Sequence, residues 1–231
     1  MKGYDLILFD LDGTLVDSAP GITDSVAYAL SHFGIYPETR EELYKFIGPP
    51  LVDSFMRFYG FTKERAGEAV DLYRVRYRER GVHENTVYEG MRETLAALVK
   101  AGLVCAVATS KPGVFAETVL RENGLMDYFK FVSAAELDDA EGRKRRLRME
   151  KKDVIEYCLE SLGVKDRSRA LMVGDRKHDI IGAAQAGIDS MGVLFGFGSR
   201  EELEEAGATY IAETPADITK LLAGKDDVLR D

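Results

Sequence analysis

Two carboxylates follow the first apolar run of the chain, in the stretch Asp10-Leu11-Asp12-Gly13-Thr14. Side chains two apart in an extended chain point the same way, so Asp10 and Asp12 would project together beyond a strand at Leu6–Phe9. Two carboxylates this close repel, and one would take up a proton unless a cation lies between them. Gly13 suits a sharp departure of the backbone from the strand. The spacing therefore indicates a carboxylate site that binds a cation.

A second apolar run, 103–108, is followed by hydroxyl side chains. Thr109 and Ser110 would place hydroxyls and backbone amides at the end of that strand, where they could bind phosphate oxygens. Taken alone, Thr109 could equally be the N-cap of a helix.

A third run, 170–173, ends in Gly174-Asp175, and Asp179 follows one helical turn later. Asp175 alone could be a turn former, and Asp179 a first-turn helix acid. Their repetition with Asp10 at strand ends favours a shared site instead. Oxygen ligands of this kind match a hard dication, and Mg²⁺ is the usual one.

A carboxylate nucleophile and a phosphate group are both negatively charged, so a fixed cation is also needed to offset their charge. Lys151 and Lys152 stand where a helix should begin, which would bring one of them to the same edge of the sheet. Spacing does not decide between them, and Lys151 is our choice.

The elements that must position these residues alternate along the chain. Apolar runs typical of buried strands are separated by helical patterns, which predicts βαβ units, a Rossmann-like parallel sheet and helices on both faces. The expected strands are 6–9, 103–108, 129–132, 170–173 and 190–194, and the expected helices between the later ones are 113–122, 153–162 and 180–186.

Residues 19–83 interrupt this alternation. They contain helical patterns at 22–33, 38–46, 51–59 and 63–80 and no convincing strand, which predicts an all-helical cap inserted into a core of residues 1–18 and 84–231. Pro20-Gly21 and the polar residues 83–86 are the expected linkers.

Together, the Asp10–Thr14 stretch, Thr109-Ser110, a helix-starting lysine and Gly174-Asp175 with Asp179 resemble the four ordered motifs of the haloacid dehalogenase-like superfamily. The resemblance covers nearly the whole chain. It implies that Asp10 forms an aspartyl-phosphate and that Asp12 is the general acid and base. It also implies that Asp10, the backbone carbonyl of Asp12 and Asp175 hold Mg²⁺, with Asp179 in support.

The resemblance further implies that Thr109 and Ser110 bind phosphate and that Lys151 or Lys152 compensates charge. The stretch 137–151 is long and very basic, and it lacks the lysine-proline pair often found there in relatives. Two other stretches resemble the phosphoglycolate phosphatase and 5′-nucleotidase-like branch. One is residues 47–51, where Gly48 would contribute to substrate selection, and the other is 196–202, where Ser199 and Glu202 have the spacing of a helix capping box.

Composition excludes several other functions. The chain has 231 residues and a formal net charge of −9, so nucleic acid is an unsuitable partner. No apolar stretch is long enough to span a membrane, so a cytoplasmic protein is expected. The resemblance implies that its partner is a small phosphorylated metabolite. Cys105 and Cys158 lie in apolar patterns typical of buried free thiols. The basic run 143–148 is expected to be a solvated loop, and the oligomeric state stays open.

Related chemistries remain as alternatives to a phosphatase. A sugar phosphomutase shares all four motifs. A dehalogenase would not need Asp12, because halide leaves without a proton. A receiver-type signalling domain also forms an aspartyl-phosphate, but it would be about half this length and its phosphorylated aspartate would not follow the first strand.

Overall fold

A computed structural model describes residues 3–136 and 150–222, so the basic run 143–148 lies outside the described residues. The chain divides into two compact units, one of residues Met1–Val16 and Val87–Asp231 and the other of Asp17–Thr86. The expected insert, 19–83, falls within the second unit. Its action as a cap stays a prediction.

A six-stranded parallel sheet organises the described part of the first unit, in the order β5-β4-β1-β6-β7-β8. This confirms the predicted fold class. The strands are β1 (Leu6–Phe9), β4 (Val104–Pro112), β5 (Phe131–Ala135), β6 (Ala170–Gly174), β7 (Asp189–Val193) and β8 (Tyr210–Ala212).

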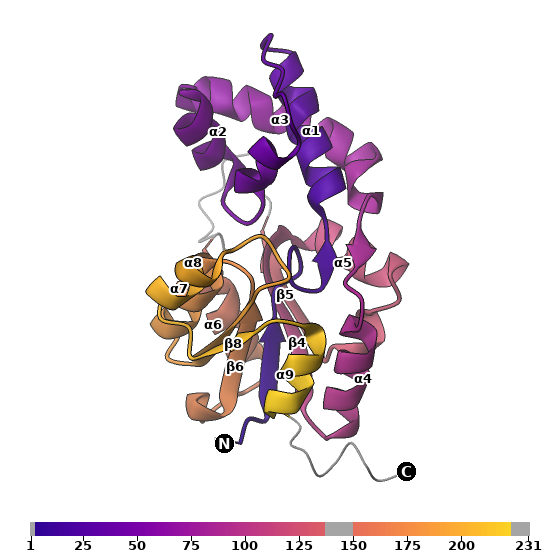
Figure 1. Cartoon of the computed structure of the whole chain (residues 1–231), viewed down its shortest axis with the longest axis vertical. Helices are drawn as coiled ribbons and strands as arrows, with labels where there is room; N and C mark the ends of the chain where they lie inside the picture. The colour runs from indigo at the N-terminus through magenta and orange to yellow at the C-terminus, as the bar shows by residue number, and fades with distance from the viewer. Residues whose placement is uncertain (1–2, 137–149, 223–231) are drawn as a thin grey trace. The chain divides into compact units, whose positions relative to one another are not determined.

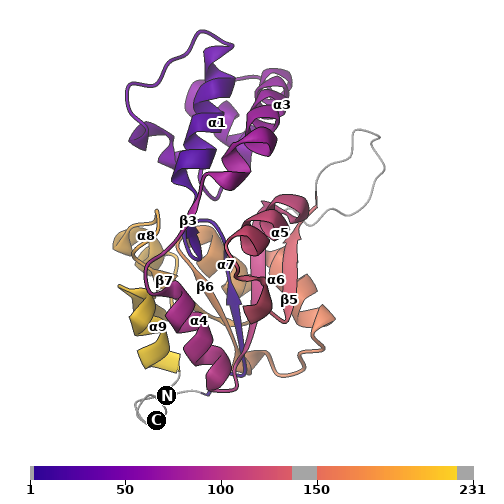
Figure 2. The ribbon, with the colours of Figure 1, turned by 90° about the vertical axis from the view of Figure 1, so that its right-hand side faces the viewer.

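Helices cover both faces of this sheet. Figure 1 shows α6 and α7 on one side and α4 and α9 on the other, and Figure 2 shows α4 beside α9. The helices of this unit are α4 (Met91–Lys100), α5 (Gly113–Glu122), α6 (Lys151–Ser161), α7 (Lys177–Gln185), α8 (Arg200–Glu205) and α9 (Pro215–Leu222).

Strand β1 lies in the middle of the sheet and packs on apolar side chains. All four residues of β1 are buried, and Leu6 and Leu8 share a core with Val154 and Ile155 of α6 and with Ala183 of α7. Because both faces are covered, the strands read as continuous apolar runs rather than as alternating patterns.

The second unit is helical. It contains α1 (Ala19–Ser31), the 3₁₀ helix η1 (Glu41–Phe46), α2 (Leu51–Tyr59), α3 (Lys63–Glu79) and the 3₁₀ turn η2 (Gly81–His83). Aromatic rings form much of its interior: the Phe46 ring centroid lies 5.0 Å from that of Phe55 and 5.5 Å from that of Phe58.

The chain passes between the units through β2 (Val16–Asp17) and β3 (Thr86–Val87), which form a two-stranded sheet. The predicted linker at Pro20-Gly21 is wrong, because both residues belong to the first turn of α1. Proline is tolerated there, since its missing N–H would have no partner within the helix.

Other boundaries differ from the predictions locally. The strand expected at 129–132 begins at Phe131, since the Phe129 amide still donates to the carbonyl of Met126 and closes the 3₁₀ turn Met126–Tyr128. The strand β8 and the helices α4 and α9 were not predicted, whereas α8 begins after Ser199 as the capping pattern predicts.

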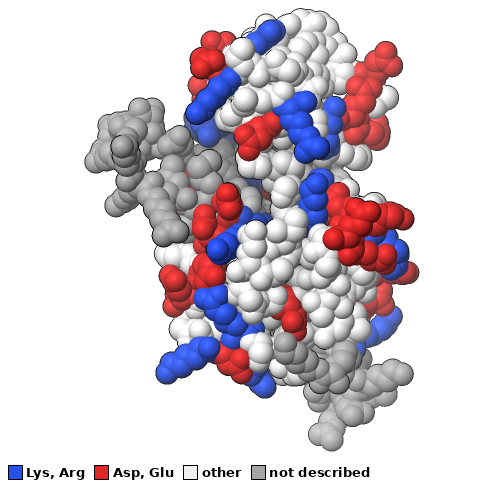
Figure 3. Space-filling view, turned by 90° about the vertical axis from the view of Figure 1, so that its left-hand side faces the viewer, with Lys and Arg blue, Asp and Glu red and all other residues white. Residues whose placement is uncertain are grey.

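Charged side chains of both signs are interspersed on the face in Figure 3. Within residues 3–136 and 150–222, no helix is both long and apolar enough to cross a membrane.

Candidate active site

The sheet order brings three of the predicted residues to one edge. The central strand β1 pairs with β4 on one side and β6 on the other, and all three run parallel. Asp10 follows β1, Thr109 lies near the end of β4, and Asp175 follows β6. Residues far apart in sequence therefore meet where the strands end.

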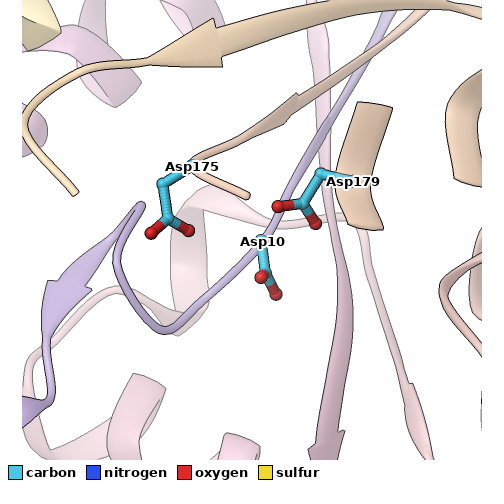
Figure 4. Close-up of side chains that lie close together, drawn as sticks. All are labelled: Asp10, Asp175 and Asp179. Atoms are coloured by element: carbon cyan, nitrogen blue, oxygen red, sulfur yellow. The ribbon is translucent and has the colours of Figure 1, made fainter. Parts of the chain in front are cut away.

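Three buried carboxylates form the centre of this edge. Oxygen atoms of Asp10, Asp175 and Asp179 all lie within 4.8 Å of one another, and Figure 4 shows the three side chains converging. Their exposed fractions are 6%, 0% and 1%. The Asp179 carboxylate, expected only in a supporting role, thus belongs to the same cluster.

Lys151 supplies a fixed positive charge to the cluster. Its Nζ lies 2.8 Å from Oδ1 of Asp10 and 2.8 Å from Oδ1 of Asp179, and it donates to the carbonyl of Ala108 at 3.1 Å. Lys152 is exposed. The structure therefore places Lys151, and not its neighbour, against the carboxylates.

Burial and mutual repulsion shift the acid–base behaviour of this group. Burial raises the pKa of Asp10 to about 6, with the charges of Asp179 and Asp12 adding to the effect and Lys151 opposing it. Burial and the charges of Asp179 and Asp10 raise the pKa of Asp175 well above its ordinary value. Burial alone would lower the pKa of Lys151, but the two adjacent carboxylates outweigh it and the pKa is raised.

Asp12 faces a second lysine, which the sequence reasoning missed. The Nζ of Lys111 lies 2.8 Å from Oδ1 and 2.9 Å from Oδ2 of Asp12. Lys111 comes two residues after Thr109 in β4, so its place just beyond the predicted site hydroxyls was a signal that its side chain could reach the same edge of the sheet. The Asp12 side chain consequently lies outside the three-carboxylate cluster.

Asp175 is enclosed by close backbone contacts. The amide of Phe197 donates to its Oδ2 at 2.8 Å, and Thr14 Oγ1 donates to Oδ1 at 3.4 Å. A Cβ atom at Gly13, whose φ is +80°, would overlap the Asp175 carboxylate. Gly13 is therefore required both for the turn and for the space that this carboxylate occupies.

The remaining predicted residues lie as follows. Thr109 is buried and its Oγ1 accepts a hydrogen bond from the Lys111 amide at 3.1 Å, so it does not cap α5, which begins after Pro112. Ser110 is half-buried in β4. Gly48 belongs to the second unit, in the turn between η1 and α2, with φ of +101°.

The predicted capping box at 199–202 is half wrong. Ser199 does cap α8, since its Oγ accepts from the Glu202 amide at 3.2 Å. The Glu202 carboxylate, however, accepts from the Lys177 amide and Arg176 Nε, each at 2.9 Å.

The cluster has the donor set for a hard cation. Oδ1 of Asp10 and Oδ1 of Asp179 are buried, and each lies 2.8 Å from the Lys151 ammonium, so one lysine serves both carboxylates. Four aspartates at the site, Asp12 included, face two lysines. A dication would neutralise the excess, and all-oxygen ligands suit Mg²⁺.

Several known proteins are similar in sequence to this chain. Residues 7–193 match the family model described as haloacid dehalogenase-like hydrolase. The chain is 43% identical to a 5′-nucleotidase of Pseudomonas aeruginosa over 95% of this chain and 96% of the relative. A phosphoglycolate phosphatase of Vibrio parahaemolyticus is 29% identical, over 94% and 96%.

Solved structures share the whole fold. The crystal structure of a predicted phosphatase from Clostridium acetobutylicum superposes with a TM-score of 0.88 and 44% sequence identity, covering 95% of this chain and 98% of that one.

The raised pKa of Asp10 predicts a stability effect in the metal-free protein. With a folded pKa of about 6 against an ordinary 3.8, the contribution of Asp10 to stability is present below pH 3.8 and is lost as pH rises through 6. Asp10→Asn should therefore raise the melting temperature at pH 7.5 in chelator, and the gain should vanish towards pH 4. Thermal unfolding across this pH range measures it.

Asp127→Asn, which removes one exposed charge in the same unit, is the control. A destabilised Asp10→Asn protein at pH 7.5 would contradict the repulsion inferred for the cluster.

Proposed function

The chain belongs to the haloacid dehalogenase-like hydrolase family and is a phosphatase acting on phosphorylated substrates, and on that premise we propose that it hydrolyses small phosphomonoesters through an aspartyl-phosphate on Asp10. The observation that carries the proposal is the position of Asp10. It follows the central strand, is buried, and lies within 2.8 Å of the Lys151 ammonium.

The first half of the reaction transfers the phosphoryl group to the protein. An Oδ atom of Asp10 attacks phosphorus, the Asp10–phosphorus bond forms, and the bond from phosphorus to the leaving oxygen breaks. The Asp12 carboxyl group gives its proton to that leaving oxygen.

The second half releases the phosphate. Asp12, now a carboxylate, takes a proton from water while the water oxygen attacks phosphorus. The bond between phosphorus and the Asp10 oxygen breaks, inorganic phosphate leaves, and the Asp10 carboxylate is restored. Thr109, Ser110 and Lys151 hold the phosphate oxygens and offset their charge during both halves.

A magnesium ion would neutralise the charge between Asp10 and the substrate phosphate. We assign its binding to Asp10, Asp175 and the backbone carbonyl of Asp12, with Asp179 in support. The buried cluster of acidic oxygens supports this assignment.

For the substrate we propose a small metabolite, such as a phosphorylated two-carbon acid or a nucleoside monophosphate. The similarity to a 5′-nucleotidase and to a phosphoglycolate phosphatase supports both classes. Transfer of the phosphate to a sugar instead of water, as in a phosphomutase, is the alternative, and a sugar acceptor assay distinguishes it. We also propose a cytoplasmic setting, which suits the buried free thiols of Cys105 and Cys158; fractionation of cells tests it.

The roles of the two aspartates predict different defects with 4-nitrophenyl phosphate. Asp10→Asn should abolish turnover and give no burst of nitrophenol. Asp12→Asn should lose at least about a hundredfold in steady-state rate. It should still give a burst of about one nitrophenol per active site, because this leaving group departs without a proton while the second step lacks its base. Stopped-flow absorbance measures both, and near-normal turnover by Asp10→Asn would rule out the mechanism.

Metal removal should abolish activity. Excess chelator should stop hydrolysis, and Mg²⁺ should restore it where Ca²⁺ does not, because Ca²⁺ takes more ligands in a looser geometry. Mg²⁺ should also raise the melting temperature of the wild type and leave Asp175→Asn nearly unchanged. Full activity in chelator would indicate a metal-free hydrolase.

Substrate selection we assign to the second unit, with Gly48 in its 47–51 turn. Gly48→Ala should change the ratio of kcat/KM values among phosphorylated metabolites while sparing 4-nitrophenyl phosphate. Gly60→Ala is a nearby control, since Gly60 also has a positive φ, +64°, at the other end of α2. Equal losses on every substrate for Gly48→Ala would place selection elsewhere.

A further inference from the structure

The segment 196–202 lies against the chain that carries two of the three clustered carboxylates. A Cβ atom at Gly196 would overlap Asp175 and the carbonyl of Gly13, and one at Gly198 would overlap the carbonyl of Asp175. Together with the hydrogen bond from the Phe197 amide, these contacts leave Asp175 little freedom. The glycines are required by this close approach.

Glu202 holds the next part of the same chain. Its Oε1 accepts from Lys177 N and from Arg176 Nε, both at 2.9 Å, and its ion pair with Arg176 is mostly buried, with exposed fractions of 23% and 14%. Arg176 in turn donates its backbone N–H to Oδ2 of Asp179 at 3.0 Å. One carboxylate on α8 therefore fixes the two residues that follow Asp175 and lead into Asp179.

The contacts of Glu202 oppose the electrostatic repulsion among the carboxylates of the site. Asp10, Asp175 and Asp179 are buried within 4.8 Å of one another and repel, so the 175–179 stretch would spread without an external restraint. Glu202 and the loop of residues 196–198 restrain this stretch. Groups that orient metal ligands in this way typically change metal affinity about 10- to 100-fold when they are removed.

We infer that Glu202 is a positioning residue, which through Arg176 and the Lys177 amide holds Asp175 and Asp179 at the spacing a divalent cation requires. The inference rests on the proposed metal dependence. It assigns no contact between Glu202 and the substrate.

Direct metal binding tests the inference. Isothermal titration with Mg²⁺ should give Glu202→Ala a dissociation constant raised about tenfold, and Glu202→Gln, which keeps the shape and an acceptor oxygen, a smaller increase. The Mg²⁺ concentration for half-maximal activity should rise in parallel, by more than kcat at saturating Mg²⁺ falls. Glu201→Gln removes the same charge from an exposed position in the same helical turn and should bind Mg²⁺ like the wild type.

Melting temperatures in chelator separate positioning from stability. A lower melting temperature with unchanged Mg²⁺ affinity in both Glu202 variants would overturn the inference and leave Glu202 as a structural contact of α8. Should Glu202→Ala fail to fold, the affinity of Glu202→Gln decides in the same way. If the wild type itself binds no Mg²⁺, the proposed metal dependence fails and this inference fails with it. If the wild type binds Mg²⁺ and both Glu202 variants bind it with the same affinity, only the inference about Glu202 is overturned.

Discussion

Repulsion among three buried carboxylates is the constraint on which the rest of this site depends. Oxygen atoms of Asp10, Asp175 and Asp179 lie within 4.8 Å of one another, and burial raises the pKa of Asp10 and of Asp175. Lys151 offsets part of that charge through its contacts with Asp10 and Asp179. The buried oxygens of the cluster could hold a cation, which would balance the remaining negative charge.

The fold creates this arrangement from short, local devices. A parallel sheet with β1 at its centre aligns the ends of β4, β1 and β6, which is where open α/β sheets bind ligands. Gly13 makes room for Asp175, while α6 begins at Lys151 and so directs the lysine to the same edge. Asp10 and Asp175 directly follow strands, and Lys151 and Asp179 lie in the first turns of helices, which suits a site that needs exact positions.

Local patterns made most of this predictable from the sequence. Asp10 and Asp175 each follow a continuous apolar run, and both the strand and its end can be recognised within a few residues. Lys111 was missed because its partner Asp12 lies 99 residues earlier in the chain. Glu202 was misassigned for a similar reason: the spacing from Ser199 suggests a local cap, but Arg176 and the Lys177 amide compete for its carboxylate across the fold. The three-residue β8 was too short to give a pattern. The roles of the site residues stay predictions.

Identification of the phosphorylated residue tests the central claim most directly. Wild-type protein mixed with substrate and Mg²⁺ would be quenched in acid within milliseconds, treated with borohydride and mapped by mass spectrometry. An aspartyl-phosphate at position 10 would be reduced there to homoserine, and only in samples that received substrate. Unmodified Asp10 during rapid turnover, or phosphate recovered on another residue such as Ser110, would contradict the account.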